Sequence, residues 1–176
     1  DVKQNPLYQD EDFALLDTHY YGGIKKYQWV ALPLALHGVV AKKNGELTEI
    51  CIGEKEDDPV FCITDLLPHL AAKQNERPLQ EGLKGEELNV VLGSLPYEGE
   101  DIKEAVKLSV LALLHEQYGM KEKDFYRAEI ELVPAVKARD IGLDRSLIGA
   151  YGQDDRVCAY TALTAEIDTK KPEHTT

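Results

Sequence analysis

Residues 139–161 read RDIGLDRSLIGAYGQDDRVCAYT and carry the most informative pattern of the chain. A β-like run, 147–151, leads through Gly-Gln-Asp-Asp-Arg (152–156) into apolar residues at helical spacing. Asp154 and Asp155 are therefore expected at a helix N-terminus, where unpaired peptide N–H groups and the helix dipole favour negative charge. Two interpretations stay open here. The aspartates form an ordinary helix N-cap, or one of them ligates a metal where a strand passes into a helix.

The composition excludes several classes of protein. With 176 residues, 43% hydrophobic and 30% charged, the chain suits one globular domain, or one domain and part of another. Its net charge of −12 argues against nucleic acid or an anionic membrane as a partner. No apolar run reaches the roughly twenty residues of a membrane span, and no signal peptide opens the sequence. Three scattered cysteines, Cys51, Cys62 and Cys158, favour buried thiols in a reducing compartment. We therefore expect a cytoplasmic protein.

The pattern along the chain predicts an α+β fold. Strand-like runs are expected at 13–20, 36–42, 46–52, 59–63, 88–92 and 126–132, with helices at 64–71 and 101–118. Asn44-Gly45 predicts a tight hairpin turn, because both residues tolerate positive φ. Asp101 and Glu104 resemble a capping box at the start of the longer helix, and Gly119 suits its C-terminal end. Tight turns between strands predict antiparallel pairing that closes into a small β-barrel-like or curled sheet.

A change of sequence composition after Pro134 predicts a domain boundary near residue 138. Residues 1–138 form one domain, with a helical elaboration at about 64–118, and residues 139–176 form a separate strand–helix segment. The chain opens on Asp1 instead of methionine and ends in the polar TKKPEHTT, so we expect a piece of a longer protein.

Asp154 has the right chemistry for a two-metal site, yet the chain lacks nearby partners. Two-metal hydrolases hold their cations about 3.5–4 Å apart and often bridge them with a carboxylate. Each metal also needs His, Asp or Glu ligands of its own. None of the five histidines stands at HxxH, HxxxH or HxD spacing, and each fits a packed or solvated position: His19, His37, His69, His115 and His174. Either Asp154 is structural, or the other ligands lie outside this sequence.

Three segments together resemble a known family. ARDIGLDRSLIGAYGQDDRVCAYTAL, with HYYGGIKKYQWV earlier and TDLLPHLA between them, is similar to the aspartyl aminopeptidase and vacuolar aminopeptidase I family of zinc metallopeptidases, in its bacterial branch. In that family a catalytic α/β domain holds two zinc ions. A β-barrel-like lid domain is inserted into it and mediates dimer contacts within tetrahedral dodecamers. The resemblance implies that residues 1–138 are the lid and dimerisation domain and that 139–176 return to the catalytic domain.

The resemblance also assigns roles to individual residues. Asp154 matches the aspartate that bridges both zinc ions, with Asp155 and Arg156 orienting it. His69 matches a histidine that reaches a neighbouring subunit's active site, where it binds substrate or stabilises the transition state. The other zinc ligands and the general base would lie before Asp1 and after Thr176. We therefore expect this chain alone to be inactive and to bind zinc no better than a generic acidic surface.

The resemblance implies peptide substrates and self-association into dimers and larger homo-oligomers. It also implies that residues 140–151 are poorly packed or domain-swapped here, because their sheet neighbours are missing. A rival hypothesis is a free-standing, non-catalytic interaction module in which GQDDR is a structural helix cap. A lid from a related glucanase-like or tetrahedral aminopeptidase is a third. The full-length reading frame separates the first two, and assays on peptides and sugars identify the third.

Overall fold

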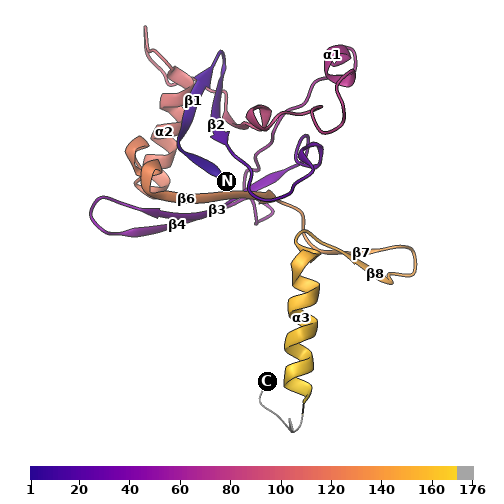
Figure 1. Ribbon diagram of the computed structural model, residues 1–176. Coiled ribbons are helices and arrows are strands. Elements are labelled where there is room, and N and C mark those ends of the chain that lie inside the picture. The colour runs from indigo at the N-terminus through magenta and orange to yellow at the C-terminus, as the bar shows by residue number, and fades with distance from the viewer. Residues whose placement is uncertain (170–176) are drawn as a thin grey trace. The chain divides into compact units, whose positions relative to one another are not determined.

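The structure, a computed structural model, describes residues 1–169 and has a mixed α+β fold (Figure 1). It divides into two compact units, one covering Asp1–Ala135 and one starting at Val136. The strands and helices of the first unit are β1 (Val2–Asp10), β2 (Phe13–Thr18), β3 (Leu34–Ala41), β4 (Leu47–Ile52), α1 (Ala72–Asn75), β5 (Val90–Gly93), α2 (Ala105–Tyr118) and β6 (Ala128–Pro134). Short 3-10 turns lie at η1 (Lys26–Gln28), η2 (Gly85–Glu87) and η3 (Glu122–Arg127). The second unit contains β7 (Arg139–Ile141), β8 (Leu147–Gly149) and α3 (Gln153–Asp168).

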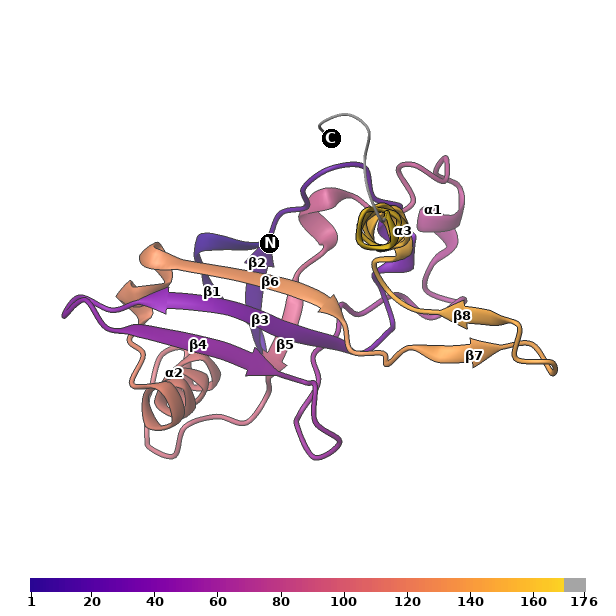
Figure 2. The same ribbon diagram turned by 90° about the horizontal axis from the view of Figure 1, so that it is seen from below.

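Two antiparallel three-stranded sheets build the first unit. Their strand orders are β1-β2-β5 and β4-β3-β6, and Figure 2 shows the second sheet with its three strands side by side. The segment 61–63 touches both sheets through isolated bridges, Phe61 to Leu34 and Cys62 to Val91. The predicted α+β class with antiparallel strands is confirmed. The described residues form no closed barrel, because segment 61–63 contributes single bridges instead of a continuous strand.

An apolar core holds these sheets and α2 together. Leu16, Leu34 and Val90 are almost fully buried between the sheets, and α2 buries Val106 and Val110 against them. Burial of one such side chain stabilises the fold by about 1.5–3 kcal/mol. The sheets are therefore fixed by apolar packing, and the loops that leave them are free to carry polar groups.

The β3–β4 hairpin lies where Asn44-Gly45 predicted it, but of these two residues only Gly45 has positive φ, so a turn with positive φ at both is wrong. Gly45 has φ +86, which glycine adopts at little cost. The Lys42 N–H donates to Glu46 O at 2.8 Å and closes the turn, and β3 and β4 then pair in continuous register. The alternation predicted for 126–132 is present only within β6, where Ile130 and Leu132 are buried while Glu129 and Glu131 are exposed. Tyr126, expected on the buried face, lies in η3 and is 57% exposed, so the prediction is wrong there.

The start of α2 differs from the prediction. The helix begins at Ala105, and Asp101 and Glu104 both have positive φ, so the capping box is wrong. The cap comes instead from β1, where Gln9 Oε1 accepts hydrogen bonds from the N–H groups of Val106 and Lys107. The expected C-terminal glycine is confirmed, since Gly119 has φ +64 and donates to His115 O.

One further prediction fails in the first unit, and one strand was not predicted. Residues 64–71 are extended and turn structure, with α1 starting only at Ala72, so the predicted helix is wrong. Residues 64–70 are all exposed, so their leucines provide no buried stripe that would stabilise a helix. Strand β1 had no clear sequence signal. Its alternation is interrupted at Pro6, and the β1–β2 register shifts between Val2 and Leu7.

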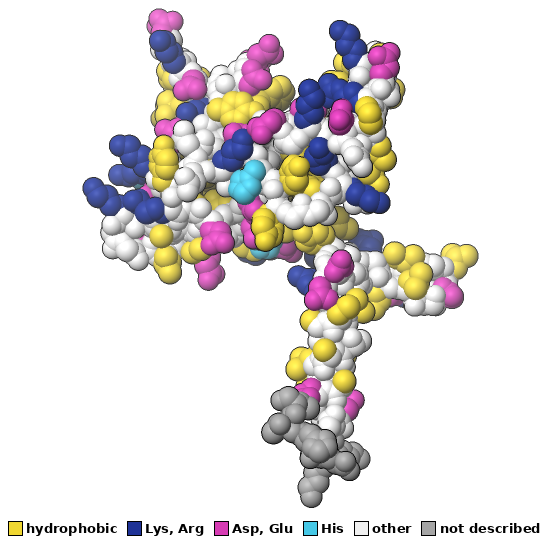
Figure 3. Space-filling view, viewed as in Figure 1, with side chains coloured by type: hydrophobic (Ala, Val, Ile, Leu, Met, Phe, Trp, Pro, Cys, Tyr) yellow, Lys and Arg dark blue, Asp and Glu magenta, His cyan; other side chains and the backbone are white. Residues whose placement is uncertain are grey.

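The second unit is a short hairpin followed by a helix. β7 pairs antiparallel with β8, from Arg139 opposite Gly149 to Ile141 opposite Leu147. No residue of α3 is buried, and Figure 3 shows apolar side chains on its visible face. The exposed large apolar side chains of α3 are Val157, Tyr160, Leu163 and Ile167. Among the described residues, no helix combines the length and apolarity needed to cross a membrane.

Candidate functional site

Asp154 lies in an irregular turn that opens α3. Gly152 has φ +75, and the backbone angles of Asp154 and Asp155 are not helical, so the regular helix starts after Asp155. The peptide bond between the two aspartates is cis. An N-cap side chain would bond to a backbone N–H of the first turn, but neither the Asp154 nor the Asp155 carboxylate accepts a hydrogen bond from a described residue. The simple helix-cap interpretation therefore lacks the bond that defines it.

Neighbouring residues hold this turn in place. The side-chain amide of Gln153 donates to Ile148 O at 3.2 Å and joins the turn to β8. The guanidinium of Arg156 lies over Gly152, where a Cβ would come within 3.6 Å of Cζ. The Asp154 carboxylate itself is exposed and forms no hydrogen bond or ion pair with any described residue. The turn therefore presents an unpaired carboxylate to solvent.

An unpaired carboxylate fits zinc as one ligand, because zinc accepts Asp oxygens alongside His and Cys ligands. The described part of the chain contains no group of three or more His, Cys, Asp or Glu side chains placed to hold a metal. Asp154 can therefore supply one ligand, and residues 1–169 do not complete a zinc site around it.

His69 lies at the tip of an exposed turn in the first unit. The N–H groups of Leu70 and Ala71 both donate to Leu67 O, at 2.8 and 3.0 Å, so His69 is enclosed by this turn. Its imidazole is exposed and makes no hydrogen bond or ion pair with the residues that the structure describes. The flanking Leu66 and Leu67 are more than half exposed. The ring is thus available to a group outside this chain.

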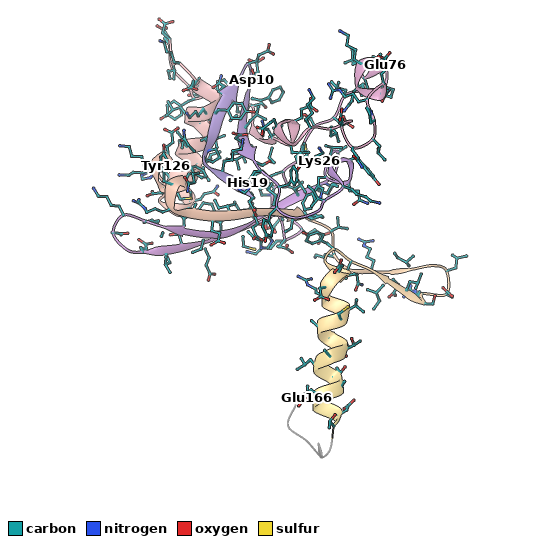
Figure 4. All side chains as sticks on the ribbon, in the orientation of Figure 1. Asp10, His19, Lys26, Glu76, Tyr126 and Glu166 are labelled. Atoms are coloured by element: carbon teal, nitrogen blue, oxygen red, sulfur yellow. The ribbon has the colours of Figure 1, made fainter. Side chains whose placement is uncertain are left out.

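A cavity of about 430 Å³ lies beside the His69 turn. Tyr27 of η1 forms one wall, Leu66 and Pro68 another, and Leu79 and Leu83 contribute apolar surface. Figure 4 labels Lys26 on η1 and Glu76 immediately after α1, the two segments that border this part of the unit. The His69 turn therefore has a hollow next to it whose lining is both polar and apolar.

The long excursion after α1 is held by charged groups. Arg77 Nη1 lies 3.3 Å from Glu87 Oε1 and 3.4 Å from Gly82 O. The Lys84 N–H and the Arg77 guanidinium both lower the pKa of the Glu87 carboxyl, and the Lys84 N–H has the larger effect. These contacts keep residues 77–87 together next to the cavity.

Two other histidines have structural surroundings. His37 Nε2 lies 2.8 Å from Glu54 Oε1, and His115 Nδ1 lies 3.2 Å from Met120 O at the end of α2. These contacts fit the packed or solvated positions expected for them. His69 belongs to the first unit and Asp154 to the second.

The side chains that hold the two turns have no signal in the sequence. Gln153 stands inside the motif quoted for Asp154, but no spacing rule shows that its amide reaches back to β8. Asp65 Oδ1 accepts hydrogen bonds from Leu66 N at 2.8 Å and from Gln74 Nε2 at 3.0 Å, a contact between residues nine positions apart.

Comparison with known proteins gives a consistent family match. The family described as aminopeptidase I zinc metalloprotease (M18) matches residues 1–176. A "Probable M18 family aminopeptidase 1" of Clostridium acetobutylicum is 52% identical over 175 residues, covering 99% of this chain and 38% of that protein. The crystal structure of an M18 aminopeptidase from Thermotoga maritima superposes with a TM-score of 0.91 at 55% identity, covering 98% of this chain and 37% of that one.

A more distant match concerns the fold alone. The structure of the S. cerevisiae mApe1 dodecamer is 18% identical with a TM-score of 0.57, and the match covers 94% of this chain and 35% of that one. This chain spans little more than a third of the length of the relatives that it matches.

Proposed function

This chain belongs to the aminopeptidase I zinc metalloprotease (M18) family, and from that premise we propose that it is part of a two-zinc aminopeptidase that removes N-terminal residues from peptides. The observation that carries the proposal is the unpaired Asp154 carboxylate at the start of α3. It lies in a chain that matches the family from end to end yet spans about 37% of its relatives' length. The rest of the zinc site then belongs to the remaining polypeptide.

We assign residues 1–138 to a lid and dimerisation domain built on antiparallel sheets, elaborated at about 64–118, and residues 139–176 to a returning segment of the catalytic domain. The exposure of α3 supports the second assignment. Val157 to Ala165 contains no charged residue, and a helix that is apolar on all sides is normally buried in a larger core. The exposed hairpin of β7 and β8 likewise fits strands that pair elsewhere in the parent protein.

Each site residue has a defined part in this proposal. Zinc, when bound, activates water and polarises the substrate carbonyl. Asp154 would supply its carboxylate to both metals, as the resemblance to the family implies. Gln153 and Arg156 border the turn that carries it, and Asp155 and Arg156 orient it. His69 acts on substrate in a neighbouring subunit. The general base comes from another part of the parent chain, so this chain alone is inactive.

Self-association follows from the proposed role of His69, because that residue needs a second subunit. The exposed leucines beside it support a protein contact at this turn. The assembly proposed is a dimer within a tetrahedral dodecamer in the cytoplasm. With a net charge of −12, nucleic acid and membranes are not its partners.

Calorimetric zinc titration of this chain and of the full-length protein tests the proposal. We expect the full-length protein to bind two zinc ions per subunit and to release N-terminal residues from peptides. We expect this chain to show only weak zinc binding, matched by its Asp154→Asn variant. Tight stoichiometric zinc binding by this chain would contradict the proposed split site. Absence of peptide hydrolysis by the zinc-loaded full-length protein would contradict the assigned activity.

A further inference from the structure

The loop that carries His69 is closed by a hydrogen bond between two side chains. Gln74 Nε2 donates to Asp65 Oδ1 at 3.0 Å, and the same oxygen accepts from Leu66 N at 2.8 Å. We propose that Asp65 and Gln74 are positioning residues that hold His69 ready for a neighbouring subunit's substrate. The inference rests on the role proposed for His69 and adds to it the residues through which the loop acts.

The loop has a fixed base on one side. Ala71 is only 4% exposed, and its carbonyl accepts the Asn75 N–H at 2.8 Å, which joins the loop to α1. Gln74 lies in α1, so the donor of the closing bond is itself held by this short helix. The Asp65–Gln74 hydrogen bond therefore joins the start of the loop to its end at α1, which the buried Ala71 fixes in place.

The tip of the loop has few constraints of its own. Residues 64–70 are exposed and form neither helix nor strand, and the turn around Leu67 is their main backbone order. Fixing a residue's backbone in one conformation costs conformational entropy. A hydrogen bond that orders the loop before substrate binds lowers the entropy cost of ordering His69 when substrate binds.

The chemistry of the pair suits this task. One carboxylate oxygen takes two N–H donors, so Asp65 fixes both the backbone at Leu66 and the side chain of Gln74. Neither residue is near a second unpaired histidine or a cluster of metal-ligating groups in the described chain. Asp65 and Gln74 would therefore affect the reaction by positioning His69.

A double-mutant cycle in the full-length enzyme separates positioning from general stability. Gln74→Leu removes the donor at similar size. Gln80→Leu is its control, because Gln80 is exposed on the same excursion and its side chain makes no hydrogen bond with the described residues. We expect Gln74→Leu to lower kcat/KM about tenfold, since misplacement by about 1 Å can cost up to roughly a hundredfold. Asp65→Ala should act likewise, and Asp65→Asn, which keeps an acceptor oxygen, should restore most of the activity.

The His69→Ala background gives the decisive comparison. There Gln74→Leu should change kcat/KM by less than about twofold, because its effect runs through the missing ring. A full additional loss in that background would overturn the inference, as would an equal loss in Gln80→Leu. Zinc content should stay at the wild-type level in every variant.

Hydrogen exchange keeps the inference separate from the role of His69. If His69→Ala leaves kcat/KM unchanged, the role proposed for His69 fails. Exchange in the full-length enzyme still reports on the loop. The amides of Leu70 and Ala71 should exchange about tenfold faster in Gln74→Leu than in wild type or Gln80→Leu. Unchanged exchange would show that the side-chain bond does not order the loop and would overturn the inference by itself.

Discussion

Gln9 Oε1 lies 3.0 Å from the backbone nitrogen of Val106, so a side chain of β1 caps a helix that begins almost a hundred residues later. The same oxygen accepts the Lys107 N–H at 3.2 Å. Free N–H groups at a helix start are normally satisfied by a residue just before it. Here the cap connects the first strand to the longest helix of the first unit.

Loss of this cap should destabilise the first unit. Gln9→Leu removes the acceptor and leaves two N–H groups without it, so we expect the free energy of unfolding to fall by about 1 kcal/mol. Urea denaturation measures the change. Gln4→Leu on the same strand is the control, because Gln4 is exposed. Equal stability of the two variants would show that the Gln9 contact contributes nothing.

Gly38 should tolerate no side chain. It pairs with Ile50 on one side and Ile130 on the other, and a Cβ there would overlap Glu129 O and lie 2.7 Å from Ile130 Cα. We expect Gly38→Ala to lower the free energy of unfolding by about 1–3 kcal/mol, since backbone of a paired strand must shift. Gly23→Ala is the matched control, because a Cβ at Gly23 meets nothing within 4 Å. A similar loss in both variants would contradict the close approach of β3 and β6.

Asp58 should make stability depend on pH in the acid range. The Lys55 N–H, and then the Gly53 N–H, lower the pKa of its carboxyl in the folded chain. A carboxyl with a lowered folded pKa contributes stability that is fully present above its unfolded pKa of about 3.9 and is lost as pH falls through the folded value. Asp58→Asn should therefore flatten the dependence of the melting temperature on pH below about pH 4.

The control for this effect is Asp57→Asn, at the neighbouring exposed carboxyl. We expect it to retain the wild-type pH dependence. A pH profile of Asp58→Asn that matches wild type below about pH 4 would show that the folded chain does not favour the ionised form of Asp58.

Local sequence signals predicted the elements whose causes are local. The Asn44-Gly45 hairpin, the glycine end of α2 and the alternation around Ile130 are confirmed, because each depends on neighbours in the chain. The start of α2 failed because its cap comes from Gln9 on a distant strand. The leucines of 64–71 suggested a helix, but no surface of the first unit covers them.

The candidate site shows the same difference between features with local causes and features that depend on distant contacts. The aspartates of 154–155 stood out by sequence, because a strand-like run meets a helix there. The bonds that hold the two turns, Gln153 to Ile148 and Gln74 to Asp65, have no spacing signature and emerge only from the folded chain. Among the described residues no group of His, Cys, Asp or Glu side chains surrounds Asp154, so the other zinc ligands of the proposed site have no signal there.

The zinc content of the full-length protein tests the central claim most directly. Asp154→Ala and the control Asp168→Ala alter carboxylates at opposite ends of α3, and both residues are exposed here. We expect wild type and Asp168→Ala to retain two zinc ions per subunit after dialysis. Asp154→Ala should lose at least one, with its helical content and assembly unchanged. Full zinc occupancy in Asp154→Ala would contradict the assignment of Asp154 as the carboxylate shared by both metals.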